Sequence, residues 1–69
     1  MPNHTYKMTE LVGSSPIGID DAINSAVEKA SASVHNMRWF QMQEVRGHIE
    51  DGKVAHWQVT IKIGFTLDD

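Results

Sequence analysis

Trp39 is followed by glutamines at alternating positions, and this set of side chains is suited to binding a flat heteroaromatic ring. In the simplest strand register, Trp39 shares one polar face with Gln41, Gln43, Gln58 and Thr60. An indole stacks on flat rings, and a glutamine amide offers both a donor and an acceptor to a ring edge. The same tryptophan is equally consistent with packing under a neighbouring subunit or against the end of a helix, so the residues alone leave both interpretations open.

The spacing of these residues constrains any shared ligand. In a simple hairpin register Gln58 lies opposite Val45, which is six positions, or roughly 20 Å, along the strand from Trp39. One small ring cannot contact both Trp39 and Gln58 of the same chain. If both contact one ligand, they come from different subunits, and the site lies at a symmetry axis.

Arg46 is the lone arginine within the predicted hairpin and is the candidate for binding a phosphate, since its guanidinium offers a fork of donors. A solvated strand charge, or an ion pair with Glu44 or Glu50, explains it equally well. Trp57 alternates with apolar residues, and we expect it to pack rather than to bind a ligand.

The remaining residues give no pattern for catalysis or metal binding. The histidines are His4, His35, His48 and His56, and none are at a zinc-finger or His-Glu-x-x-His spacing, so we expect no metal site. The segment 13–15 precedes a helix but lacks the lysine of a phosphate-binding loop. No Ser-His-Asp or Cys-His arrangement can be argued, and we expect a protein that is not an enzyme.

Composition argues against several partners. Six Lys and Arg against nine Asp and Glu give a net charge of -3, which does not suit non-specific nucleic-acid binding. No apolar run approaches the ~20 residues of a membrane span, and the first residues lack a signal-peptide pattern. The absence of cysteine suits a reducing compartment, and we expect a cytoplasmic protein.

The fold that must position these residues is predicted to begin with a strand and a helix. Residues 5–12 alternate and predict a strand, which Gly13-Ser14-Ser15-Pro16 is expected to break. Apolar residues then recur at helical spacing at Ile19, Ala22, Ile23, Ala26, Val27, Ala30, Val34 and Met37. This stripe predicts an amphipathic helix with Asp20 and Asp21 in its first turn and His35 and Arg38 near its last.

A hairpin follows, with one strand over about 39–50, an Asp51-Gly52 turn, and a last strand whose alternation runs from His56 to Leu67. The second strand alternates cleanly, whereas the first changes face near Gln43-Glu44 and predicts a β-bulge there. The fold class is therefore α+β, in the order β-α-β-β, with a three-stranded antiparallel sheet wrapped around one helix in a single domain over 1–69. One helix cannot cover such a sheet, and a 69-residue chain is marginal alone, so we expect a homo-oligomer.

Several short motifs, taken in order along nearly the whole chain, give it a strong resemblance to the bacterial dodecin family. They are Tyr6-Lys7, Glu10-Leu11-Val12-Gly13-Ser14-Ser15, Asp21-Ala22-Ile23, Trp39-Phe40, Arg46-Gly47, Asp51-Gly52, Val54-Ala55-His56, Gln58-Val59-Thr60 and Gly64-Phe65. The resemblance implies a hollow homododecamer that holds flavins in antiparallel pairs between two symmetry-related tryptophans. It also implies a role in flavin storage, buffering and photoprotection, in which an excited flavin is quenched by electron transfer from the indole.

The resemblance assigns flavin-binding roles to Trp39, Gln58 and Arg46, with FMN as the typical ligand and riboflavin or FAD as alternatives. Some bacterial dodecins also bind coenzyme A, for which Lys7, Lys29 and His35 are the candidates here. The chain departs from the family at Arg38, where aspartate is common, and at Thr66, where arginine is common. The alternative to a flavin store is therefore a structural oligomer or a coenzyme A-binding shell with weak flavin binding. A flavin oxidoreductase ranks below both.

Overall fold

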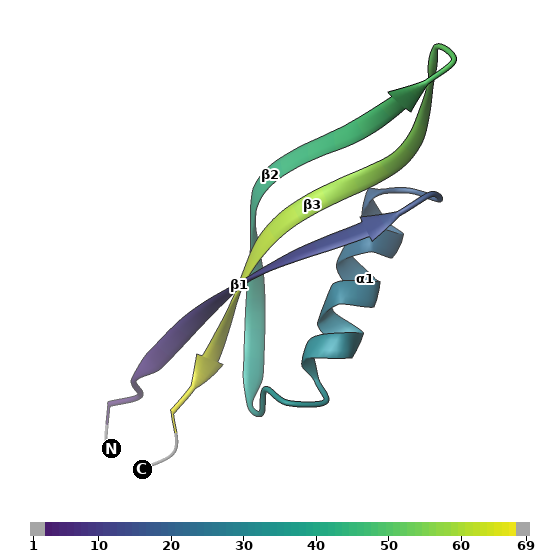
Figure 1. Cartoon of the computed structure of the whole chain (residues 1–69). Helices are drawn as coiled ribbons and strands as arrows, with labels where there is room; N and C mark the ends of the chain where they lie inside the picture. Colours follow the sequence, from purple (N-terminus) through teal and green to yellow (C-terminus); the bar gives the residue numbers. More distant parts are fainter. Residues whose placement is uncertain (1–2, 68–69) are drawn as a thin grey trace.

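The structure, a computed structural model, describes residues 3–67 and contains one helix and three strands. The chain runs in the order β1 (Tyr6–Ser15), α1 (Ile19–Ala30), β2 (Met37–Glu50) and β3 (Lys53–Thr66). The three strands form one antiparallel sheet in the order β1-β3-β2, and α1 covers one face of it (Figure 1). The predicted α+β class and the β-α-β-β order are confirmed.

The core lies between α1 and the two strands β1 and β3. Its buried apolar side chains are Ala22, Ala30, Val59, Ile61 and Ile63. The helix approaches the sheet so closely that a Cβ on Gly13 would collide with the Ala22 carbonyl oxygen. The alternation predicted for the last strand is thus confirmed at Val59, Ile61 and Ile63.

The first strand extends three residues further than predicted. Gly13, Ser14 and Ser15 remain paired with β3 instead of breaking the strand, since the glycine is needed where the helix backbone approaches. Ser15 is buried, and its hydroxyl donates to Asp21 Oδ2 at 2.7 Å and accepts from the Ile17 amide at 2.9 Å. The polar side chain at the end of β1 therefore forms the hydrogen bonds that hold the junction between β1 and α1.

The helix is shorter than the apolar stripe predicted. It ends at Ala30, so His35 lies in the connection to β2 and Arg38 lies within β2; their placement near the last helical turn was wrong. The Val34 amide donates to the Ala30 carbonyl at 2.8 Å in the turn that follows. Val34 and Met37 nevertheless pack against the core, which is why the stripe continues past the end of the helix.

The hairpin turn forms as predicted, with positive φ angles of 52° at Asp51 and 74° at Gly52. The predicted bulge is confirmed as a register shift between Met42 and Glu44, but two further shifts occur, between Met37 and Trp39 and between His48 and Ile49. The last of these skips a residue on β3, so that Gln58 lies opposite Arg46. The predicted pairing of Gln58 with Val45 was therefore wrong by one residue.

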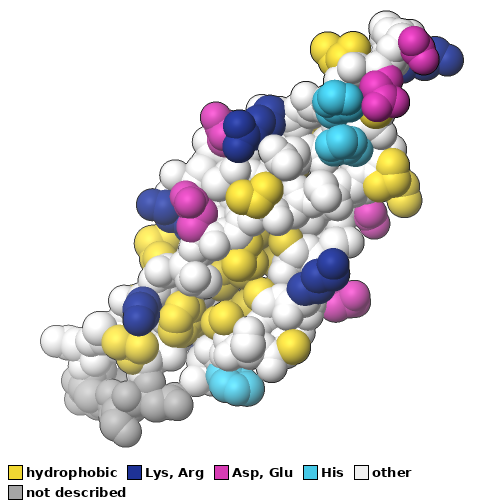
Figure 2. Space-filling view, viewed as in Figure 1, with side chains coloured by type: hydrophobic (Ala, Val, Ile, Leu, Met, Phe, Trp, Pro, Cys, Tyr) yellow, Lys and Arg dark blue, Asp and Glu magenta, His cyan; other side chains and the backbone are white. Residues whose placement is uncertain are grey.

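The helix leaves much of the sheet uncovered. It packs against β1 and β3, and every residue of β2 except Met37 is exposed. The exposed apolar side chains of β2 are Trp39, Phe40, Met42, Val45 and Ile49. Figure 2 shows hydrophobic side chains gathered along the middle of one face of the molecule. A single chain thus presents an unusual amount of apolar surface to water.

Candidate functional site

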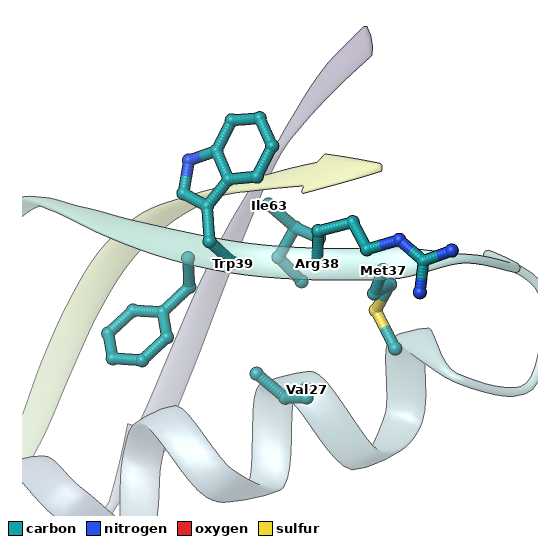
Figure 3. A pocket seen from close by; sticks show the side chains of 6 residues that line it. Val27, Met37, Arg38, Trp39 and Ile63 are labelled. Carbon is teal, nitrogen blue, oxygen red and sulfur yellow. The ribbon is translucent and has the colours of Figure 1, made fainter. Parts of the chain in front are cut away.

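Trp39 projects from the sheet face opposite to α1, as the alternation predicted. Figure 3 shows its indole on one side of β2, with Met37 and Val27 on the other. The ring lies over Gly64, where an added Cβ would collide with it, and meets the Tyr6 ring edge-on at a centroid distance of 5.3 Å. The sequence did not single out Tyr6, although its place in the alternating first strand puts it on this face. Trp39 is 39% exposed, so part of the anchored indole remains available for contact.

Gln58 and Arg46 are direct cross-strand neighbours on β3 and β2. They therefore share one face, which is the face of Trp39 and Gly64 because strand alternation places Gln58 and Gly64 on the same side. Gln58 is half-buried on the central strand, and Arg46 is exposed. The Arg46 Nε atom lies 3.8 Å from Glu44 Oε1, and both side chains are about 60% exposed. An exposed pair of this kind is weak, so the guanidinium can meet a ligand anion at little cost.

Trp39 and Gln58 lie far apart within the chain. Trp39 pairs with Gly64, which is six positions from Gln58 along β3, or roughly 20 Å at the rise of a strand. The separation predicted from the sequence is confirmed despite the one-residue error in register. A single ring stacked on Trp39 cannot reach Gln58 of the same chain.

The three residues assigned tentatively to coenzyme A are spread over one end of the fold. Lys7 pairs with Phe65, Lys29 is exposed in the last turn of α1, and His35 is exposed in the following connection. His35 lines a shallow hollow of about 260 Å³ with Asn36, Phe65 and Thr66 among its other walls.

The two positions that depart from the family pattern are in contact. Arg38 Nε donates a hydrogen bond to Thr66 Oγ1 at 3.1 Å, across 28 positions of sequence. Nothing local in the sequence predicts this contact, because it follows from the register shift between Met37 and Trp39. The guanidinium of Arg38 therefore lies beside Thr66, the position at which the resemblance leads us to expect arginine.

A second hollow lies between α1 and β2. It has a volume of about 270 Å³, and most of its lining is apolar, from Val27, Met37, Phe40 and Ile63 (Figure 3). It opens where the helix does not reach β2. Its lining suits an apolar side chain better than a polar ligand.

Two further observations concern the described residues as a group. Within residues 3–67, no cluster of three or more His, Asp or Glu side chains is placed to hold a metal ion. The one helix in this range is too short and too polar to cross a membrane.

His48 and His56, eight positions apart in the chain, are cross-strand neighbours, and the simple hairpin register does not predict this pair.

These features describe a small α+β chain with a partly exposed indole on a sheet that its one helix covers incompletely. The comparisons with known proteins agree. Residues 5–68 match the Dodecin family model. The chain is 38% identical to the dodecin of Thermus thermophilus over 93% of both proteins.

Two solved structures show the same fold at higher identity. The dodecin from Streptomyces davaonensis is 53% identical, with a TM-score of 0.92 over 99% of this chain and 100% of its own. The dodecin from Streptomyces coelicolor is 54% identical, also with a TM-score of 0.92, over 100% of this chain and 99% of its own. The chain belongs to the dodecin family, and membership indicates an oligomeric protein that binds small molecules.

Proposed function

We propose that this chain stores and buffers flavin, holding FMN or riboflavin in stacked pairs at twofold contacts of a hollow homododecamer. The observation that carries the proposal is the Trp39 indole, which projects from the face away from α1 and is 39% exposed. Gly64 and Tyr6 fix its position on the sheet. A fixed, partly exposed indole is a stacking surface for a flat ring.

In this proposal each flavin is held by residues of more than one chain. Trp39 of one chain stacks on the isoalloxazine ring, and the Gln58 amide of another donates to and accepts from the ring's edge. Arg46 lies opposite Gln58 and supplies a guanidinium to the phosphate of FMN. Because Gln58 and Arg46 are neighbours, FMN is the flavin whose ring edge and phosphate contact both residues.

Stacking also suggests what the protein does with the flavin. An electron-rich indole against an excited flavin quenches it by rapid electron transfer and return, which protects the cell from flavin photochemistry. A ring covered on both faces leaves no room for a substrate. The proposed protein is therefore a binding protein and not an enzyme.

The test uses the fluorescence of FMN. Adding the apo-protein to FMN should quench flavin fluorescence strongly, and Trp39→Ala should lose most of that quenching. Trp57→Phe is the matched control, because Trp57 lines a hollow beside the start of α1 and is expected to leave quenching unchanged. Quenching by Trp39→Ala equal to that of the wild type would rule out the stacking role.

A second candidate is coenzyme A, favoured by the contact of Arg38 with Thr66 beside the hollow that His35 lines. In this alternative, Arg38 supplies the guanidinium that Thr66 lacks, and Lys7, Lys29 and His35 add positive charge for the phosphates. Calorimetric titration with coenzyme A is the test. Binding that is lost in Arg38→Ala and kept in Trp39→Ala would support a coenzyme A site separate from the flavin site.

A further inference from the structure

The hairpin brings two histidines into contact beside its turn. His48 on β2 and His56 on β3 are cross-strand neighbours, with ring centroids 5.4 Å apart and ring planes inclined by only 16°. They lie one row beyond Arg46 and Gln58, on the same face of the sheet. Each ring is attached to a separate hydrogen-bonded strand, so the backbone holds the pair together without help from a ligand.

Two imidazoles held this way form a chelating pair. A metal ion bound at about 2.0–2.1 Å from each nitrogen needs its two ligand nitrogens within roughly 4 Å of each other. The ring centroids are 5.4 Å apart, so the two side chains must rotate to aim one nitrogen of each ring at a shared ion. Imidazole is a preferred ligand of copper, nickel and zinc, whereas calcium and magnesium prefer oxygen.

We propose that His48 and His56 together bind one divalent transition-metal ion of the imidazole-preferring class, with one nitrogen from each ring. Solvent completes the coordination, because residues 3–67 offer no cluster of three ligating side chains. The site is independent of the proposed flavin site, since it uses neither Trp39 nor Gln58.

The neighbouring charges favour a cation at His48. Glu50 Oε2 lies 3.3 Å from His48 Nε2, which leaves the other ring nitrogen, Nδ1, for the metal. Such a carboxylate fixes the ring and increases its basicity as a ligand. Of the two nearby cations, Arg46 is paired with Glu44 at 3.8 Å, and Lys53 is the strand partner of Glu50.

The experiment is a calorimetric titration of the untagged assembly with Zn²⁺. The wild type should bind one ion per chain, and His48→Ala and His56→Ala should each reduce binding to the non-specific level. Glu50→Gln should weaken binding by about tenfold, the usual effect of losing a carboxylate that orients a histidine ligand. His35→Ala is the matched control, because His35 is exposed in a loop at the other end of β2, and it should bind as the wild type does.

Far-UV circular dichroism should be unchanged in all variants, because these side chains are outside the core of the chain, and light scattering checks that each variant still assembles. With Cu²⁺, electron paramagnetic resonance should detect two coordinating nitrogens in the wild type and one in either histidine variant. Trp39→Ala should keep metal binding, so failure of the flavin proposal leaves this one standing. Unchanged Zn²⁺ binding in His48→Ala or His56→Ala, or equal loss in His35→Ala, would overturn it.

Discussion

At the scale of single residues, the proposed flavin site depends on how firmly the Trp39 indole is held. Its support comes from a glycine below it and a tyrosine edge beside it, and neither contact requires a polar partner. Steric contacts with Gly64 and Tyr6 therefore position the indole. A larger side chain beneath the indole should weaken ligand stacking without removing any group that contacts the ligand.

Replacing Gly64 with alanine tests this support directly. The added methyl group would collide with the Trp39 ring, so the indole must move, and overpacking of this kind costs about 1–3 kcal/mol of stability. We expect Gly64→Ala to fold with a lower melting temperature and to quench FMN less than the wild type. Gly18→Ala is the control, because a Cβ there meets nothing within 4 Å. Full quenching by Gly64→Ala would mean that the position of the indole on the sheet is unimportant.

Arg46 should discriminate between flavins. Arg46 is the strand partner of Gln58, and its guanidinium forms an exposed ion pair with Glu44. Arg46→Ala should weaken FMN binding by about 1.5–3 kcal/mol, the range for a hydrogen bond to a charged group, and leave riboflavin binding unchanged. Titrations of both flavins measure this, with Lys53→Ala as a control cation beside the hairpin turn. Equal weakening of both ligands would assign Arg46 to the ring and not to the phosphate.

At the scale of elements, the junction between β1 and α1 is fixed by one buried hydroxyl. Ser15 donates to Asp21 and accepts from the amides of Ile17 and Gly18. Ser15→Ala removes three part-buried hydrogen bonds and should lower the free energy of unfolding by about 1–3 kcal/mol. Denaturant titration measures this, and the exposed Ser14→Ala is its neighbour control. Equal stability of the two variants would show that the junction does not depend on this hydroxyl.

The elements also show which features local sequence determines. The Asp51-Gly52 turn and the alternation of Val59, Ile61 and Ile63 depend on backbone preference and on one buried face, and both were predicted correctly. The end of α1 was not, because Val34 continues the apolar stripe while packing from a turn.

For the candidate site, the sequence was sufficient to put Trp39 on the correct face and to separate it from Gln58. The pairings of Gln58 with Arg46 and of His48 with His56 were missed. They depend on a bulge that skips Ala55, and no local pattern marks that residue. The skip at Ala55 is reversed by the bulge at Gln43, so only the pairs between these two residues are misplaced, and Trp39 still pairs with Gly64.

At the scale of the whole molecule, the chain is an incomplete unit. It is elongated, measuring 56 × 20 × 13 Å, and one helix covers only part of one sheet face. The apolar side chains of β2 are exposed in the single chain, which is why we expect other copies of the chain to cover them. Family membership supports such an assembly.

Ile49, which is 71% exposed on β2, tests that prediction. Ile49→Glu should leave the fold of the chain intact, because the side chain is outside the core, and should shift light scattering toward smaller species. Gln43→Glu adds the same charge to the same strand without removing apolar surface and should assemble normally. If Ile49→Glu assembled as the wild type does, this part of β2 would not be a subunit contact.

The stoichiometry of FMN binding tests the paired flavin site most directly. Two chains that each contribute one Trp39 to a stacked pair of flavins bind two flavins, so quenching of FMN fluorescence should saturate at one flavin per chain. Saturation at one flavin for every two chains would mean a single flavin between the two indoles, and the paired site would be wrong. An absence of saturable quenching would remove the flavin site altogether, and coenzyme A would become the ligand to test.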